Sequence, residues 1–314
     1  MSTLLITGST GKVADSLIRS PLFQDTNIIA VSRKSGNLGI ARKNLKSLSY
    51  EEALQNSHSW NIDTVVLAGS ITGIKEMSNN PIQNIFENIK CSVRFIQQLT
   101  NRGVNIRKVI HLGSVTQYGA QKLESVSEDH CLNPMTYYDQ SKTIIESLLN
   151  QVFYDGSIGQ LWNLRLSNIF GFSFDNNPQR GFFDSCIRRL MEGKQVQIFG
   201  DGQHIRDYLH FEDLLKLLKN LHDLEPRATS ESLNVASGNA VTIRQAVSEI
   251  ANIIFDRYGR ESIINYVPFP AETAAIDYRS FGISTHKSFD TYGWRADVSL
   301  RAGIEKSFSR DFNQ

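Results

Sequence analysis

The stretch Thr3-Leu4-Leu5-Ile6-Thr7-Gly8-Ser9-Thr10-Gly11-Lys12-Val13-Ala14 decides the fold. Its apolar run is long enough for a buried strand, Gly8 and Gly11 predict a tight turn, and residues 12–20 have a helical pattern. This order directs backbone N–H groups and the positive end of a helix dipole toward one point. That point suits a pyrophosphate, with Ala14 in place of a third glycine, so the stretch predicts a dinucleotide site rather than an ordinary turn.

Composition limits the classes of function. The chain has 314 residues, with 33 basic against 32 acidic side chains, so it shows no charge excess typical of nucleic-acid or membrane surfaces. Its cysteines, Cys91, Cys131 and Cys186, have no metal-ligand spacing and favour a reducing compartment. The first strand leaves no room for a signal peptide, and no apolar run approaches the ~20 residues of a membrane span. We expect a cytoplasmic protein without a metal.

Strands and helices are expected to alternate in the first half of the chain. After the opening stretch, the expected strands are 27–31, 44–48, 62–68, 109–112 and 159–166. The expected helices between them are 50–56, 81–102 and 136–153. Alternation at this spacing predicts an α/β fold with a Rossmann-type, doubly wound parallel sheet.

The second half has smaller elements. Helices are expected over 182–192, 211–222, 242–255 and 300–312, and strands over 195–199 and 232–235. We therefore predict a dinucleotide-binding domain over 1–170 plus about 211–240, and a mixed α/β substrate lobe over 171–210 and about 241–314.

The end of the second strand bears on the cofactor. A carboxylate there would bind a ribose 2′-hydroxyl, but this chain has Ser32-Arg33-Lys34. A guanidinium matches a 2′-phosphate, so the segment favours NADP(H) over NAD(H). A solvated pair of cations is the alternative interpretation.

Three residues have a pattern typical of proton transfer. Ser114 follows a buried strand, at the edge where open parallel sheets bind ligands. Tyr138 and Lys142 are four residues apart and share a helix face, where an ammonium lowers the pKa of a phenol. A phenol of this kind serves as a general acid or base. Tyr137 is the neighbouring alternative, but only Tyr138 has this offset from Lys142.

These features together resemble the extended short-chain dehydrogenase/reductase family, of the nucleotide-sugar epimerase/dehydratase/reductase type. The resemblance covers nearly the whole chain. Its further motifs are Leu67-Ala68, Asn88, Ser114-x-x-x-Tyr118-Gly119, Leu164-Arg165-x-x-Asn168-x-x-Gly171, Gly200-x-Gly202-x-x-x-Arg206-Asp207-Tyr208-x-His210-x-x-Asp213 and Gly293-Trp294.

The resemblance implies a role for each candidate site residue. Tyr138 would exchange the proton of the substrate oxygen, Lys142 would lower the pKa of Tyr138 and bind the nicotinamide ribose, and Ser114 would hold the reacting oxygen. Asn168 and Arg206 would contact the diphosphate of a nucleotide-sugar substrate. Cofactor contacts are implied for Gly8, Thr10, Gly11, Lys12, Val13, Ser32, Arg33, Lys34, Leu67, Ala68, Gly69, Asn88, Tyr138 and Lys142.

The chain also departs from the family pattern. Val115-Thr116-Gln117 has no carboxylate where the dehydratases carry an Asp-Glu pair, which argues against 4,6-dehydration. Leu48-Ser49 replaces an acidic residue that usually binds adenine. Ala274 stands about where many members place a second diphosphate-binding arginine, although Arg279 lies nearby.

The histidines are interpreted as structural rather than catalytic. His111 lies within an expected buried strand, and His210 matches a family position that is usually structural. His130 precedes Pro134 in a loop and carries no signal.

Three functions are consistent with these residues. The first is an NADPH-dependent reductase of a nucleotide-activated 4-keto-6-deoxy sugar, with hydride delivered to C4 and Tyr138 as proton donor. The second is a nucleotide-sugar 4-epimerase with tightly bound NAD, and the third is a non-catalytic dinucleotide-binding regulator. By family resemblance we expect a homodimer formed through the helices at 81–102 and 136–153.

Overall fold

The computed structural model describes residues 1–36, 38–121, 125–171, 181–270 and 279–311. The chain divides into two compact units, each with its own core. The first comprises Met1–Gln117, Leu132–Arg165 and Leu215–Leu233, and the second comprises Tyr118–Cys131, Leu166–Leu214 and Asn234–Gln314.

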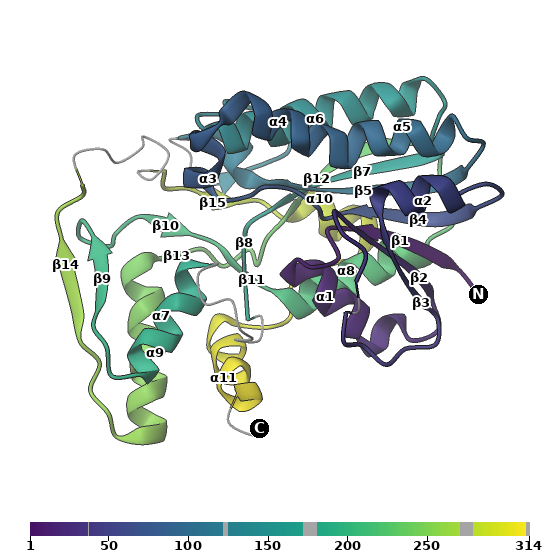
Figure 1. The fold of residues 1–314 in the computed structure, drawn as a ribbon. Coiled ribbons are helices and arrows are strands. Elements are labelled where there is room, and N and C mark those ends of the chain that lie inside the picture. The colour runs from purple at the N-terminus through teal and green to yellow at the C-terminus, as the bar shows by residue number, and fades with distance from the viewer. Residues whose placement is uncertain (37, 122–124, 172–180, 271–278, 312–314) are drawn as a thin grey trace. The chain divides into compact units, whose positions relative to one another are not determined.

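A seven-stranded sheet with the order β12-β7-β5-β4-β1-β2-β3 organises the first unit (Figure 1). The pairs β1·β2, β1·β4, β2·β3 and β4·β5 are all parallel. Chain order reverses between β1 and β4, and such a switch point is where open α/β sheets bind ligands. The strands are β1 (Thr3–Thr7), β2 (Asn27–Ser32), β3 (Leu45–Ser49), β4 (Asn61–Leu67), β5 (Asn105–Ser114), β7 (Gln160–Leu166) and β12 (Ser230–Val235).

Helices cover both faces of this sheet, which confirms the predicted doubly wound fold. In Figure 1, α2, α4, α5 and α6 lie over one face, and α1 and α8 lie over the other. Apolar residues of α2, α5 and α6 share one core with alternate strand residues such as Leu5 and Val65. The helices are α1 (Lys12–Arg19), α2 (Tyr50–Asn56), α3 (Ile74–Asn79), α4 (Pro81–Ile89), α5 (Phe95–Thr100), α6 (Tyr137–Tyr154) and α8 (Phe211–Asp223).

The predicted helix over 81–102 is interrupted in the middle. Pro81 occupies its first turn, where a missing N–H costs nothing, and a π-helical segment, Lys90–Arg94, separates α4 from α5. The expected strand 109–112 is the carboxyl-terminal half of β5, which begins at Asn105.

The second unit has short strands paired two by two. The parallel pairs are β11·β8, β14·β9 and β15·β6, and β10·β13 is antiparallel. Its core joins apolar residues of α7, α9 and α11. The elements are β6 (Ser125–Val126), β8 (Asn168–Phe170), α7 (Phe182–Met191), β9 (Val196–Phe199), β10 (Ile205–Arg206), β11 (Tyr208–His210), β13 (Val241–Thr242), α9 (Ile243–Tyr258), β14 (Ile264–Val267), β15 (Gly282–Ile283), α10 (His286–Tyr292) and α11 (Leu300–Asp311).

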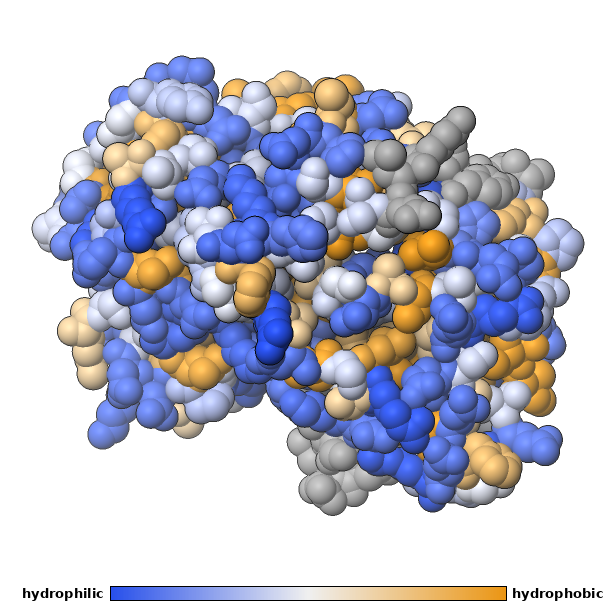
Figure 2. Space-filling view, turned by 180° about the vertical axis from the view of Figure 1, so that it is seen from behind, coloured by the Kyte–Doolittle hydropathy of each residue, from blue (hydrophilic) through white to orange (hydrophobic). Residues whose placement is uncertain are grey.

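Figure 2 shows one face of the molecule. The left part of this face is mostly hydrophilic, and hydrophobic residues gather along its upper edge. Among the described residues, no helix is both long enough and apolar enough to cross a membrane.

Candidate functional site

The glycine turn after β1 lies against the loop after β4. Gly8 has a φ of +70°, and a Cβ on it would stand 2.5 Å from the backbone α-carbon of Gly69. The N–H of Gly69 donates to Thr7 Oγ1 at 3.1 Å, and the N–H of Gly11 donates to the Gly8 carbonyl at 2.8 Å. Both the positive φ and the close approach exclude a side chain at Gly8.

The start of α1 fits a pyrophosphate. Gly11 is the N-cap residue and offers no side-chain hydrogen bond, so the N–H groups of the first turn are left uncapped by it. The hydroxyl of Ser9, buried beside this turn, has no hydrogen-bond partner within the described part of the chain. Uncapped donors, a helix dipole and an unsatisfied hydroxyl favour an anion here. Thr10, Lys12 and Val13 lie on this same turn.

The turn after β2 presents its two cations to solvent. The buried Ser32 hydroxyl donates to the Lys34 carbonyl at 2.7 Å, which holds the turn, while Arg33 and Lys34 are exposed. Glu52 reaches this turn, accepting from Ser35 Oγ at 3.2 Å. Its carboxylate is also held by the capping box with Ser49 at the start of α2.

Asn88 holds the loop that follows Leu67, Ala68 and Gly69. Its Oδ1 accepts the N–H of Ile71 at 2.7 Å, and its Nδ2 donates to Ser141 Oγ on α6 at 3.0 Å. Asn88 is buried on α4, so it ties this predicted cofactor loop to the helix that carries Tyr138 and Lys142.

Tyr138 and Lys142 lie on one face of α6, as expected. The helix begins with a capping box between Thr136 and Asp139. The Lys142 ammonium lies 5.9 Å from the centroid of the Tyr138 ring and donates to the Leu112 carbonyl at 2.7 Å and to Ser70 Oγ at 3.1 Å. Burial lowers the pKa of Lys142 to about 8.

Ser114 is the last residue of β5, two residues beyond the carbonyl that Lys142 contacts. Its hydroxyl pairs with Thr116 Oγ1 at 2.9 Å and accepts the N–H of Thr116 at 3.2 Å. The first unit therefore brings the strand end with Ser114 and the helix with Tyr138 and Lys142 into direct contact. Tyr137, the alternative to Tyr138, is 42% exposed.

Asn168 contacts Asp207, the residue that follows Arg206, in the second unit. The Asn168 side chain donates to the Asp207 carbonyl at 2.8 Å, and Arg206 donates to the carbonyls of Ile205 and Arg279. Asp207 is buried, and its carboxylate accepts four hydrogen bonds, from Ser167 Oγ, Ser237 Oγ and the N–H groups of Ser237 and Gly238. Asp207 thus fixes the backbone next to Arg206, and its carbonyl holds the Asn168 side chain. Asn168 and Arg206 are the two residues predicted to bind the diphosphate. The predicted equivalent of a second arginine, Ala274, lies outside the described residues.

The histidines are packed as predicted from the sequence. His111 Nδ1 lies 3.2 Å from Asn163 Oδ1, and burial, with the charge of Lys142, lowers the pKa of His111 to about 3. His210 is buried against the ring of Phe170, with 5.3 Å between centroids. His130 pairs with Ser127.

The sequence motifs include Gln117, Arg165 and Asp207 but predict no structural role for them, and they do not include Glu146. Gln117, Glu146 and Arg165 form one hydrogen-bonded cluster beneath Ser114 and α6, and Asp207 has the corresponding place in the second unit. A signal existed for Glu146 and Arg165, because each is a charged residue among the apolar residues of an expected helix or strand, whereas Gln117 and Asp207 gave none.

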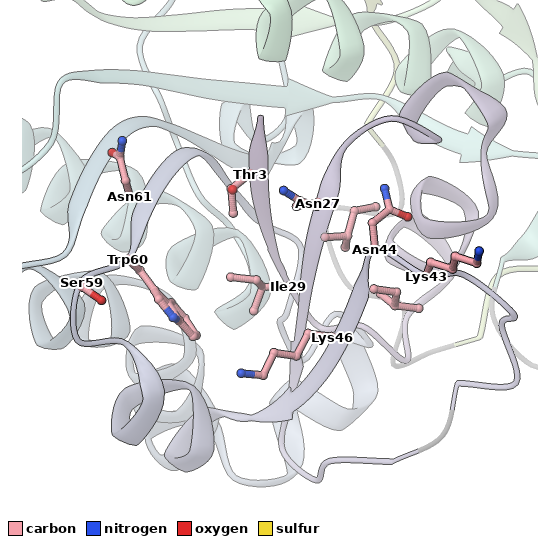
Figure 3. Close-up of a pocket in the computed structure, with 11 residues that line it drawn as sticks. Thr3, Asn27, Ile29, Lys43, Asn44, Lys46, Ser59, Trp60 and Asn61 are labelled. Atoms are coloured by element: carbon pink, nitrogen blue, oxygen red, sulfur yellow. The ribbon is translucent and has the colours of Figure 1, made fainter. Parts of the chain in front are cut away.

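A cavity of about 420 Å³ lies at the opposite edge of the sheet (Figure 3). It is lined by the amino ends of β1 and β2, by β3 and by Trp60, and the Lys46 side chain extends toward Trp60, with its ammonium 6.0 Å from the centroid of the ring. Because Gly8 and Ser32 follow the carboxyl ends of parallel strands, this cavity is separate from the predicted cofactor site. The described residues contain no group of three or more side chains suited to a metal ion.

Comparison with known proteins identifies the family. A model of the NAD dependent epimerase/dehydratase family matches residues 4–236. The UDP-glucose 4-epimerase of Mycolicibacterium smegmatis is 25% identical over 77% of this chain and 73% of its own. The GDP-L-colitose synthase of Yersinia pseudotuberculosis is 23% identical over 99% of this chain and 98% of its own.

Solved structures share the fold. MoeE5 in complex with UDP-glucuronic acid and NAD superposes with a TM-score of 0.80, at 22% identity, over 98% of each chain. The family match covers the β1 turn, Ser114, Tyr138, Lys142 and Asn168. The chain therefore belongs to the NAD-dependent epimerase/dehydratase family, and it is an enzyme of the extended short-chain dehydrogenase/reductase type.

Proposed function

We propose that the protein is an NADPH-dependent reductase of a nucleotide-activated 4-keto-6-deoxy sugar. The observation that carries this proposal is the turn after β2, where Arg33 and Lys34 are exposed and Ser32 stands in place of a carboxylate. This turn suits a 2′-phosphate. A reductase must exchange its cofactor in every turnover, whereas an epimerase oxidises and reduces its substrate with one bound NAD. A site for NADPH therefore fits a reductase better than an epimerase. Alignment with GDP-L-colitose synthase over 99% of the chain also supports it.

The chain's own residues would hold the substrate and move one proton. A bound NADPH would supply the hydride. Ser114 would hold the carbonyl oxygen of the sugar, and the Tyr138 hydroxyl would give that oxygen its proton. The Lys142 ammonium, 5.9 Å from the Tyr138 ring, favours the phenolate that remains. Asn168 and Arg206 would bind the substrate diphosphate.

A nucleotide-sugar 4-epimerase with tightly bound NAD is the second candidate. The identity to the UDP-glucose 4-epimerase of Mycolicibacterium smegmatis, 25%, favours it. A non-catalytic regulator is disfavoured because it has no use for a hydroxyl, phenol and lysine arranged as Ser114, Tyr138 and Lys142 are.

The second proposal concerns assembly. Helices α4 and α6, which lie beside each other in Figure 1, expose Ile82 (63%), Phe86 (62%), Ile144 (38%) and Leu148 (39%). We infer that these helices bind those of a second copy, because large exposed apolar patches mark interaction sites.

The reductase should oxidise NADPH when mixed with a 4-keto-6-deoxy sugar linked to a nucleoside diphosphate. Tyr138→Phe should lower kcat by about 10²–10⁴, the usual contribution of a general acid, and leave the Kd for NADPH within about twofold. NADPH absorbance and a panel of UDP-, GDP- and dTDP-linked sugars provide the measurement.

Tyr137→Phe is the matched control and should keep wild-type turnover, since Tyr137 is exposed and out of phase with Lys142. Purified protein that carries stoichiometric NAD and interconverts C4 epimers would instead establish the epimerase. A Tyr138→Phe variant with full turnover would contradict both mechanisms.

The buried Lys142 should make stability rise in alkaline solution. Its pKa is about 8 in the folded protein against 10.5 as its ordinary value, so between these values the unfolded chain binds more protons. The free energy of unfolding, relative to Lys142→Met, should increase by about 2–3 kcal/mol from about pH 7 to about pH 10. Urea titrations of the wild type and the variant at each pH measure this difference. Lys90→Met removes an exposed lysine and is the control, so its difference from the wild type should not change with pH. If the difference for Lys142→Met is equally independent of pH, the pKa of Lys142 is not lowered.

Removing the Arg33 guanidinium should shift cofactor preference. Arg33→Ala should raise the Kd for NADPH by about 10–100-fold, the range for a hydrogen bond to a charged group, and change the Kd for NADH by less than about twofold. Cofactor fluorescence measures both constants. Lys43→Ala removes an exposed cation at the opposite edge of the sheet and should change neither. Equal losses for NADPH and NADH would mean that Arg33 does not read the 2′-phosphate.

A charge on α4 should break the dimer. Phe86→Glu should convert a dimeric mass into a monomeric one in sedimentation or light scattering, because the carboxylate would have to be buried without a partner. Phe255→Glu, at an exposed position of α9, serves as the control and should stay dimeric. A monomeric wild-type protein would disprove the assembly.

A further inference from the structure

A chain of buried hydrogen bonds joins the turn after β5 to helix α6. Gln117 is fully buried in this turn. Its Oε1 accepts the N–H of Ser114 at 2.9 Å, and its Nε2 donates to Glu146 Oε2 at 2.9 Å. Glu146 lies one helical turn beyond Lys142 and two beyond Tyr138. One side chain therefore connects the elements that carry Ser114, Tyr138 and Lys142.

The far end of this chain is anchored by charge. Arg165 Nη2 contacts Glu146 Oε1 at 2.6 Å, and Ser232 Oγ donates to the same oxygen at 2.8 Å. Burial opposes ionisation of Glu146, but the hydrogen bonds and charge of Arg165, with Gln117 and Ser232, hold its pKa below the ordinary value. An ionised carboxylate only accepts, so Gln117 must turn its NH₂ toward Glu146 and its oxygen toward Ser114.

Gly113 provides the space that Gln117 uses. A Cβ at Gly113 would stand 2.8 Å from Gln117 Oε1 and 3.1 Å from the Leu164 carbonyl oxygen. Its φ is not in the left-handed region, so the reason for glycine is this close approach and not backbone conformation. The missing side chain lets Gln117 reach the N–H of Ser114.

We propose that Gln117 is a positioning residue that fixes the Ser114 hydroxyl relative to Tyr138 and Lys142 by joining the Ser114 turn to the Glu146–Arg165 pair. The inference rests on the proposed function for the role of Ser114 toward the reacting oxygen. Gln117 itself has no exposed surface and acts through Ser114. Displacements of about 1 Å in such a group lower rates by about 10²-fold, so the connection bears on catalysis.

The test compares Gln117→Met with a variant pair that restores the connection. In Gln117→Met the Ser114 amide loses its acceptor, and its hydrogen exchange should accelerate by about tenfold or more. The kcat should fall by about 10–100-fold with KM and the Kd for NADPH within about twofold. The double variant Gln117→Glu/Glu146→Gln exchanges donor and acceptor between the two side chains, so it should recover a part of both; the recovery is incomplete because Glu146 Oε2 also accepts from Arg165 Nε at 3.3 Å. Gln117→Glu alone places two carboxylates together, so it should recover neither the slow exchange of the Ser114 amide nor the kcat.

Two further variants separate positioning from loss of stability. Gly113→Ala should reproduce the Gln117→Met result, because its Cβ displaces Gln117 Oε1 while the Glu146–Arg165 pair remains. Gln160→Met is the matched control. Gln160 is also buried, and it bonds to Thr229 Oγ1 at 3.0 Å and to the N–H of Arg227 at 2.9 Å, neither of which lies on α6 or in the Ser114 turn, so Ser114 exchange and kcat should stay at wild-type values.

Unchanged exchange of the Ser114 amide in Gln117→Met would overturn the proposal, as would an equal loss of kcat in Gln160→Met. If the wild-type protein turns over no nucleotide sugar, the proposed function fails. The exchange rates of Gln117→Met, Gly113→Ala and the double variant still decide whether Gln117 fixes the Ser114 turn.

Discussion

Helix α6 turns a row of polar side chains toward the sheet, and two of them, Lys142 and Glu146, are buried and need partners. Tyr138, Lys142, Glu146 and Asn150 follow one another at intervals of four residues, so they form a stripe along the helix. Lys142 is satisfied by the Leu112 carbonyl, Glu146 by Arg165, and Asn150 by Asn163 and Ser230. A buried polar group without a partner costs about 1–3 kcal/mol, and a charged one more. A shift of α6 along its axis would break several pairs at once, so the helix has one register.

That register connects the parts of the candidate site. Ser141, next to Lys142, bonds to Asn88, which holds the loop after β4, and this loop lies against Gly8. On the other side, Glu146 reaches the Ser114 turn through Gln117. Hydrogen bonds and close contacts therefore link the glycine turn, the β4 loop, the strand end with Ser114 and helix α6. Such support is what proton transfer between positioned groups requires.

Much of the first unit could be predicted from the sequence because its signals are local. Apolar runs define β1, β2 and β4, the offset of Tyr138 and Lys142 defines a helix face, and Gly8 and Gly11 mark a turn. The partners of buried polar residues could not be predicted, since Gln117 meets Glu146 across 29 positions and Asn88 meets Ser141 across 53. The π-helical segment Lys90–Arg94 also leaves no sign in a helical period. Contacts of Arg33, Asn168 and Arg206 with cofactor and substrate stay predictions.

The close approach of Gly113 and Gln117 also constrains how this sequence can diverge. Any side chain at Gly113 competes with the Gln117 amide for the same space, so the two positions cannot change independently. A lineage that replaces Gly113 first passes through a form with a displaced Ser114 turn, whereas one that first shortens Gln117 leaves room but loses the connection to Glu146. Replacing Gly113 therefore requires a shorter residue at position 117, and Glu146 Oε2 then needs a donor in place of the Gln117 amide.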